Sequence, residues 1–261
     1  MIAEIRGEGP PLIVIHGFGV DHRIMLPLED MLGEQNWQRV YLDLPWAAAA
    51  EDTGVASPQE LADSVLEEVS QILGGRSFAV IGNSFGAMVA RHVAHTLSEQ
   101  CVGLATLAGA FQMDRTQRVL PQHQATQYDE KVLELAGEAR EEFAEMAVIH
   151  TAANLEAFER FVLPGIRESK QEVLDRIGER YSTAYTPEIA AAGTFMAPSL
   201  HVFGRQDQVV GFEDGTSFRN HHVRGTFTVL DAAGHNLHLE QPEIVSALIR
   251  EWLHRVSVFY A

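Results

Sequence analysis

The chain has 261 residues, 46% of them hydrophobic, which is enough to bury the core of one α/β domain with an insertion or of two small domains, and this excludes a globally disordered chain. The formal net charge is −17, and so acidic a surface repels nucleic-acid phosphates and anionic lipid heads, so neither is expected as a partner. The single cysteine, Cys101, excludes an internal disulfide or a multi-cysteine metal site, and its apolar neighbours predict a buried structural thiol.

The N-terminal residues, Met1 to Arg6, contain no basic region followed by a long apolar stretch, so we expect no signal peptide. No uncharged apolar run approaches the roughly 18 residues that a membrane span needs. We therefore expect a soluble, cytoplasmic protein without a membrane partner.

Short apolar runs alternate with helical patterns along the chain. They are rich in Val, Ile and Phe without polar alternation, which is typical of strands covered on both faces. The runs are residues 11–15, 39–44, 78–81, 102–107, 200–203 and 226–230. One further strand fits before Pro11. The pattern predicts the α/β class: a mostly parallel central sheet of about seven strands with helices on both faces.

Two helices of this alternation carry clear start signals. Residues 57–60, Ser-Pro-Gln-Glu, form a capping box with proline at the first helical position, and Gly74-Gly75 is a good C-terminal stop. Residues 241–243, Gln-Pro-Glu, open the last helix. Three apolar residues of that helix are expected to face the core: Ile244, Leu248 and Leu253.

The stretch from about Gln112 to Met196 contains no convincing strand. Apolar residues recur there at helical spacing: Val132, Leu135, Ala139, Phe143 and Met146. Asn154 is expected to cap a helix that ends at Pro164-Gly165, and residues 169–172 form another capping box before Val173, Leu174 and Ile177. We expect residues 1–111 and 197–261 to form the core and 112–196 a helical cap. Ordinary crossover helices are the alternative, but about 85 residues is far longer than a normal crossover.

Ser84 is the candidate nucleophile. The sequence Gly82-Asn83-Ser84-Phe85-Gly86 directly follows the apolar run 78–81 and precedes an amphipathic helical pattern. A serine hydroxyl must be exposed where a base can reach it, and a strained strand-to-helix turn achieves this when small residues stand two positions before and after the serine. The motif alone is weak, but the strand before it and the helix after it strengthen it considerably.

The apolar run 11–15 is followed by His16-Gly17-Phe18-Gly19. Glycines at a strand end leave backbone N–H groups free to point into a crevice, where they can stabilise the oxyanion of a tetrahedral intermediate. The expected donors are the N–H groups of Phe18 and Phe85. A simple glycine-rich turn is the alternative.

His235 is the candidate base, because it lies just past the last strand, where open α/β sheets place their sites. Asp207 follows the preceding strand and would orient the His235 ring, and the order Ser84, Asp207, His235 is that expected of such a site. Asp114 is the fallback acid, and an Asp in a loop otherwise serves as a turn cap. His238 is expected to be structural or exposed.

Together these pieces resemble the α/β-hydrolase superfamily, most closely the small bacterial members with a helical cap, which include esterases, lactonases, aminopeptidases and carbon–carbon bond hydrolases. The resemblance runs from residue 12 to the C-terminus and includes Gly204 to Asp207, and Gly234-His235 with Glu240 and Pro242. It implies a serine hydrolase that cleaves an ester-like bond of a small molecule through an acyl-enzyme. The cap carries no motif.

The resemblance has one clear departure, in residues 43–50. Trp46 stands where the family usually has glycine, and Ala47 to Ala50 follow it, so this loop and the nearby pocket wall are expected to differ from the family's. The substrate-pocket candidates are apolar residues at the strand ends and cap hinges: Trp46, Phe111, Met113, Phe195, Met196, Val209 and Val210. Packing of the cap onto the core is the alternative role for them. Two arginines stand near the hinges, Arg115 and Arg205, and either could pair with a substrate carboxylate. Because Arg205 is close to Asp207, a structural role is the alternative for it.

The favoured function is hydrolysis of an ester, lactone, thioester or related acyl bond of a small, mainly apolar substrate. Nothing in the motifs requires a metal or an organic cofactor, and none indicates an oligomeric state. A non-hydrolytic enzyme on the same fold, such as a lyase or cofactor-free oxygenase, is one alternative. A ligand-binding, receptor-like relative of the fold is the other. Ser84 argues against halide or epoxide chemistry, which would need an aspartate at that position.

Overall fold

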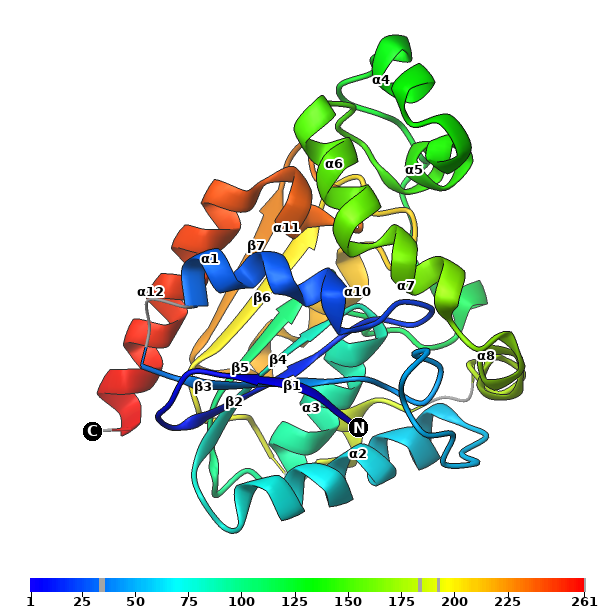
Figure 1. Ribbon diagram of the computed structural model, residues 1–261. Coiled ribbons are helices and arrows are strands. Elements are labelled where there is room, and N and C mark those ends of the chain that lie inside the picture. The colour runs from blue at the N-terminus through cyan, green and yellow to red at the C-terminus, as the bar shows by residue number, and fades with distance from the viewer. Residues whose placement is uncertain (33–35, 183–184, 192, 261) are drawn as a thin grey trace.

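The computed structural model describes residues 1–32, 36–182, 185–191 and 193–260. In this part of the chain the strands form one seven-stranded sheet in the order β1-β3-β2-β4-β5-β6-β7 (Figure 1). The β1 strand pairs antiparallel with β3, and all other neighbouring pairs are parallel. The strands are β1 (Ile2–Arg6), β2 (Pro11–Ile15), β3 (Gln38–Leu42), β4 (Phe78–Asn83), β5 (Cys101–Leu107), β6 (Ser199–Gly204) and β7 (Gly225–Leu230). The predicted fold class and strand number are confirmed.

The strand boundaries follow the apolar runs of the sequence. Strand β2 coincides with the predicted run, and all five of its residues are buried, as expected for a strand covered on both faces. The other predicted runs agree with the strands to within two residues at either end. The β1 strand, at the sheet edge, has no fully buried residue, which explains why it has no continuous apolar pattern.

Helices cover both faces of the sheet, and alternate strand residues reach opposite layers. Leu12 and Val14 pack in the cluster that contains α12 (Pro242–Tyr260), α1 (Glu29–Leu32) and the 3-10 helix η1 (His22–Leu28). Ile13 and Ile15 pack in the cluster of α2 (Pro58–Leu73) and α3 (Phe85–Thr96). The result is a three-layer helix–sheet–helix arrangement (Figure 1).

The ends of α2 match the sequence signals. The Ser57 side chain accepts a hydrogen bond from the N–H of Glu60, and Gly74 has the left-handed conformation that ends a helix, with φ of 55°. Helix α12 also begins at the predicted Pro242, but the expectation for Ile244 is wrong, because this side chain is 47% exposed. Leu248 is partly buried and Leu253 is buried. The buried stripe is shifted by one residue and consists of Val245, Ile249, Trp252, Leu253 and Val256.

Between β5 and β6 the described chain has helices but no strand. They are η2 (Arg115–Gln117), α4 (Glu130–Leu135), η3 (Gly137–Ala139), α5 (Arg140–Met146), α6 (Ala152–Phe161), α7 (Leu163–Glu168), α8 (Gln171–Gly178) and α9 (Pro187–Ala190). Figure 1 places α4 to α7 above one edge of the sheet. After β6 the remaining short helices are α10 (Glu213–Thr216), η4 (Ser217–Asn220) and α11 (Leu237–Glu240). Among the described residues, no helix has the length and apolar character needed to cross a membrane.

Four local expectations for the helical segment are wrong. Leu135 is 72% exposed, because α4 ends there and its inward positions are Val132 and Leu133. Thr151 rather than Asn154 caps α6, and the chain continues through Pro164 as α7. The capping box expected at residues 169–172 does not form. Lys170 stands at the N-cap of α8, and Ser169 donates its hydroxyl to the carbonyl of Gly165.

Candidate active site

Ser84 lies at the sharp turn between β4 and α3. Its backbone has φ of 53° and ψ of −118°, a strained conformation for a residue with a Cβ. The turn is possible because the residues two positions before and after Ser84 are glycines, Gly82 and Gly86. A Cβ on Gly82 would lie 2.3 Å from the carbonyl oxygen of Gly86, and one on Gly86 would lie 2.3 Å from that of His16. The strain presents the Ser84 hydroxyl at the end of the strand.

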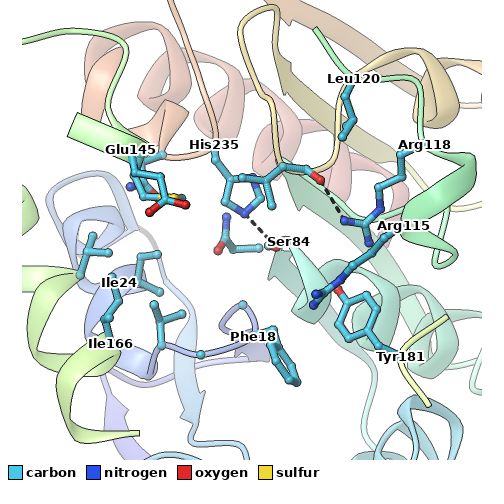
Figure 2. A pocket seen from close by; sticks show the side chains of 18 residues that line it. Phe18, Ile24, Ser84, Arg115, Arg118, Leu120, Glu145, Ile166, Tyr181 and His235 are labelled. Atoms are coloured by element: carbon cyan, nitrogen blue, oxygen red, sulfur yellow. Dashed lines mark hydrogen bonds between the residues drawn. The ribbon is translucent and has the colours of Figure 1, made fainter. Parts of the chain in front are cut away.

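Three side chains at this edge of the sheet are linked by hydrogen bonds, and Figure 2 shows the first two of them, Ser84 and His235. The Oγ of Ser84 is 2.9 Å from Nε2 of His235, and Nδ1 of His235 is 2.9 Å from Oδ2 of Asp207. Since a carboxylate only accepts hydrogen bonds, Nδ1 carries the proton when the ring is neutral, and Nε2 is free to accept the serine proton. The geometry is that of a nucleophile, a base and a group that orients the base.

The Asp207 carboxylate is fully buried and held on its second oxygen as well. Oδ1 accepts hydrogen bonds from the backbone N–H groups of Val209 and Val210, at 2.9 and 3.0 Å. Asp114, the fallback acid, instead accepts hydrogen bonds from the N–H and hydroxyl of Thr116 and caps η2.

The two expected oxyanion donors lie on segments that flank Ser84. Phe85 is the first residue of α3, so its N–H is one of the amides that have no partner within the helix. Phe18 lies in the turn after β2, which is anchored by His16. The fully buried His16 ring lies 2.8 Å from the carbonyl of Gly17 through Nδ1 and accepts a hydrogen bond from the N–H of Leu44 through Nε2. Burial lowers the pKa of His16, which favours the neutral ring that these two contacts require.

Ser84 and His235 line a cavity of about 410 Å³, a size suited to a small ligand. Phe18 and Val209 line it near the hydrogen-bonded chain. Much of the remaining wall is apolar, and most of its residues come from the segment between β5 and β6. This apolar part consists of Val20, Ile24, Leu120, Met146, Val162 and Ile166.

Charged side chains also line the cavity, on opposite sides of Ser84 (Figure 2). On one side the guanidinium of Arg115 lies over the ring of Tyr181, 4.2 Å from its centroid. Beside it Arg118 donates hydrogen bonds to the carbonyls of Gln112 and Val209, while its buried Nη2 has no hydrogen-bond partner within the described residues. Glu145 lies across the cavity. Only Arg115 of these four was singled out from the sequence, because no motif marks the others.

Val209 is the one pocket candidate that lines this cavity; the other six do not. Trp46 is fully buried beneath the turn, donates its indole N–H to the carbonyl of Val20 and contacts the Phe18 ring. Phe111 lies under the Arg91 guanidinium. The remaining four are either packed in the core beside α2 and α3 or remote from Ser84: Met113, Val210, Phe195 and Met196. A place at a strand end fixes the loop that holds a residue, but not the direction of its side chain. Arg205 is also outside the cavity, 3.8 Å from Asp231.

Two residues after the last strand support the His235 loop. Of the two roles expected for His238, structural or exposed, the structure supports the first. The ring is buried, and its Nε2 lies 2.9 Å from the carbonyl of Ile24. The Glu240 carboxylate accepts hydrogen bonds from the N–H groups of Gly234 and Val148, so it joins the His235 loop to the segment after α5. Burial raises the pKa of Glu240 to about 7.

Cys101 is buried as predicted, and burial raises its pKa to about 12.

Comparison with known proteins places these features in context. The sequence profile described as "Alpha/beta hydrolase family" matches residues 12–248. A pimeloyl-[acyl-carrier protein] methyl ester esterase of Shewanella woodyi is 24% identical over 270 residues, covering 97% of each chain. The esterase of the same name from Shewanella oneidensis is 30% identical over 109 residues, 41% of this chain and 38% of that one.

Solved structures give the same fold. An alpha/beta superfamily hydrolase from Oenococcus oeni PSU-1 superposes with a TM-score of 0.88 at 24% identity, covering 97% of this chain and 95% of the other. A thermophilic esterase from Thermogutta terrifontis superposes with a TM-score of 0.70 at 20% identity, covering 97% and 92%.

Proposed function

Because the chain belongs to the alpha/beta hydrolase family and is a hydrolase, we propose that it is a serine esterase acting through a covalent acyl-enzyme. One observation carries the proposal: the hydrogen-bonded chain of Ser84, His235 and Asp207 opens onto a cavity large enough for a small ester. The assignment gives Ser84 the role of nucleophile, His235 that of general base and Asp207 that of the group that positions the His235 ring.

In the acylation step, Ser84 Oγ attacks the carbonyl carbon of the ester while Nε2 of His235 takes the hydroxyl proton. The carbonyl oxygen becomes an oxyanion, which the N–H groups of Phe18 and Phe85 stabilise. When the intermediate collapses, the bond to the alkoxy oxygen breaks and His235 gives its proton to the leaving alcohol. The Asp207 carboxylate stabilises the imidazolium that exists between these two events.

In the deacylation step, water takes the place of the alcohol. Nε2 of His235 removes one proton from the water, and the hydroxide attacks the carbonyl carbon of the acyl-enzyme. The second tetrahedral intermediate releases Ser84, which recovers its proton from His235, and the acid leaves. These two steps need no redox partner or cofactor, because the ester, the water and these side chains account for every proton and electron pair.

We assign residues 112–196 as a cap that closes over this site. The cavity wall supports this, since eight of its residues lie between β5 and β6: Arg115, Arg118, Leu120, Glu145, Met146, Val162, Ile166 and Tyr181. The apolar wall favours a small, mainly apolar acyl group. The names of the relatives extend the set of test substrates to methyl esters of longer acyl chains. A lactone or thioester would use the same steps with a different leaving atom.

The decisive experiment is covalent labelling. A fluorophosphonate should phosphonylate Ser84 alone, since among the residues that the structure describes only this serine hydroxyl is paired with a base at 2.9 Å in a cavity. Mass spectrometry of the digested protein locates the adduct, and hydrolysis of p-nitrophenyl butyrate measures turnover. Ser84→Ala should lose both the label and the turnover while keeping its circular dichroism spectrum.

Ser169→Ala is the control, because Ser169 is partly buried but its hydroxyl donates to the carbonyl of Gly165 and meets no base. This variant should label and turn over like the parent. Equal labelling of Ser84→Ala would remove Ser84 from its assigned role. A stoichiometric burst from the parent without turnover would contradict the esterase and favour a binding function.

A further inference from the structure

A second cluster of titratable side chains lies away from the cavity that holds Ser84. Its members come from three parts of the chain: His95 near the end of α3, Glu188 in α9 and His222 just before β7. Ser84 and His95 are at opposite ends of α3, which places them about 16 Å apart along the helix axis. The exposed fractions of the three side chains are 8%, 1% and 0%. The proposed esterase mechanism uses none of them.

We propose that His95, Glu188 and His222 form a binding site for a divalent transition metal ion, with zinc as the reference ion. One ligand atom from each residue lies within 4.8 Å of the other two. Nε2 of His222 is 3.4 Å from Oε1 of Glu188, and Nε2 of His95 is 3.9 Å from the same oxygen. Bonds of about 2.0 to 2.1 Å in a tetrahedral site put neighbouring ligand atoms about 3.4 Å apart. The two distances to Glu188 therefore need a contraction of at most about 0.5 Å, whereas the two imidazoles, within 4.8 Å of each other, move together as the ion binds.

The state of these side chains suits metal binding. A coordinating imidazole must be neutral, and burial lowers the pKa of His222. Although burial acts to raise it, the Arg91 guanidinium holds the pKa of Glu188 well below its usual range, so the carboxylate is charged. Within the described residues, the buried Nε2 of His95 has no hydrogen-bond partner. A metal ion would satisfy this lone pair, whose burial without a partner is otherwise unfavourable.

Arg91 limits how tightly the ion is held. Its Nη1 lies 3.2 and 3.1 Å from the two oxygens of Glu188, so coordination through Oε1 leaves Oε2 to the arginine. Coordinating carboxylates are commonly hydrogen-bonded in this way. The nearby guanidinium also repels a cation. We therefore expect a dissociation constant on the order of micromolar, weaker than that of zinc sites built without a neighbouring cation.

An ion can reach the site from solvent. His95 lies in the walls of two surface cavities, of about 240 and 420 Å³. The ring of Phe195 closes the other side, with centroids 5.2 and 5.6 Å from those of His95 and His222. A bound ion would join α3, α9 and the segment before β7. Because it binds the folded protein in preference to the unfolded chain, it should also raise the unfolding temperature.

The test is titration of the full-length, chelator-stripped protein with Co²⁺, followed by displacement with Zn²⁺. A tetrahedral Co²⁺ site gives d–d absorption bands, and we expect them to saturate at one equivalent and to disappear when Zn²⁺ is added. His95→Ala should weaken Zn²⁺ binding at least about 100-fold, since it removes a ligand rather than an outer-shell partner, whose loss costs 10- to 100-fold. It should also abolish the Zn²⁺-dependent rise in unfolding temperature.

His95→Ala is the informative variant because the hydrogen bonds of the cluster do not depend on its Nε2. Glu188→Gln is a poorer choice, since it leaves the fully buried Arg91 without a counter-charge. His254→Ala, on the exposed face of α12, controls for adventitious surface binding and should bind like the parent. Absence of one-equivalent binding, or equal Zn²⁺ affinity in the parent and a folded His95→Ala, overturns the site. Neither result affects the esterase proposal, because hydrolysis is not the readout.

Discussion

At the scale of single residues, the surroundings of Asp207 fix what its two oxygens can do. Oδ1 accepts two backbone N–H groups, from Val209 and Val210, and Oδ2 faces the His235 ring. A group that accepts on both sides must be a carboxylate. The site therefore depends on chemistry that an amide of the same shape cannot supply.

Asp207→Asn should lower kcat by about four orders of magnitude. The two N–H groups of Val209 and Val210 hold the amide oxygen at the position of Oδ1, so the amide NH₂ must face Nδ1 of His235. The ring then carries its proton on Nε2, where it cannot accept the proton of Ser84. Steady-state hydrolysis of p-nitrophenyl butyrate at neutral pH measures the loss.

Asp114→Asn is the control for this substitution. The Asp114 carboxylate caps η2 through Thr116, and asparagine caps a helix about equally well, so kcat should stay within about twofold of the parent. A large loss in Asp114→Asn together with a small loss in Asp207→Asn would give the orienting role to Asp114.

At the scale of helices and strands, local signals decide some boundaries and tertiary contacts decide others. The start and end of α2 were predictable, because Ser57 and Gly74 are the best capping residues in their neighbourhood. The start of α6 was not, because Thr151 and Asn154 are both good caps. The fold selects Thr151, since Asn154 is buried and donates its amide to the carbonyl of Ile149. Ile244 and Val245 pose a similar choice, which only packing on the sheet decides.

Ser57→Ala should lower the free energy of unfolding by about 1 kcal/mol, the usual loss for an N-cap. The Glu60 N–H would lose its hydrogen bond to the Ser57 hydroxyl. For a protein of this size we expect the unfolding temperature to fall by about 2 to 4 °C, as measured by calorimetry.

Ser70→Ala is the matched control within the same helix. The exposed Ser70 hydroxyl bonds the carbonyl of Leu66, four residues earlier, an interaction that contributes little to a helix. Because alanine is the better helix former, the variant should be as stable as the parent or slightly more so. Equal losses in both variants would show that serine removal, and not loss of the cap, causes the effect.

At the scale of the whole molecule, the order of parallel strands brings distant residues together. Ser84, Asp207 and His235 follow β4, β6 and β7, whose carboxyl ends share one edge of the sheet, so this grouping could be predicted from the sequence. The cavity wall could not. Residues such as Arg118 and Ile166 reach it through the docking of helices between β5 and β6, and no local pattern encodes how those helices pack.

The assembled cavity predicts how activity depends on acyl-chain length. Each methylene buried against its apolar wall contributes about 0.8 kcal/mol, so kcat/KM should rise about fourfold per methylene. The series is p-nitrophenyl acetate, butyrate and hexanoate, measured at fixed pH and ionic strength. The rise should end at short to medium chains, since the cavity of about 410 Å³ is finite. A flat profile would contradict an apolar acyl pocket.

The charged side chains that line the cavity, Arg118 and Glu145 among them, provide a further test of the apolar pocket. Arg118 keeps a buried Nη2 without a described partner, and such a donor would favour a substrate carboxylate, whereas Glu145 across the cavity would repel it. The matched pair is the p-nitrophenyl ester of hexanoic acid and the mono-p-nitrophenyl ester of adipic acid, which differ in a terminal carboxylate. If apolar contact dominates, the neutral ester has the higher kcat/KM, because binding the anion removes the carboxylate from water. A clear preference for the anionic ester, lost in Arg118→Met, would assign the cavity to anionic acyl groups instead.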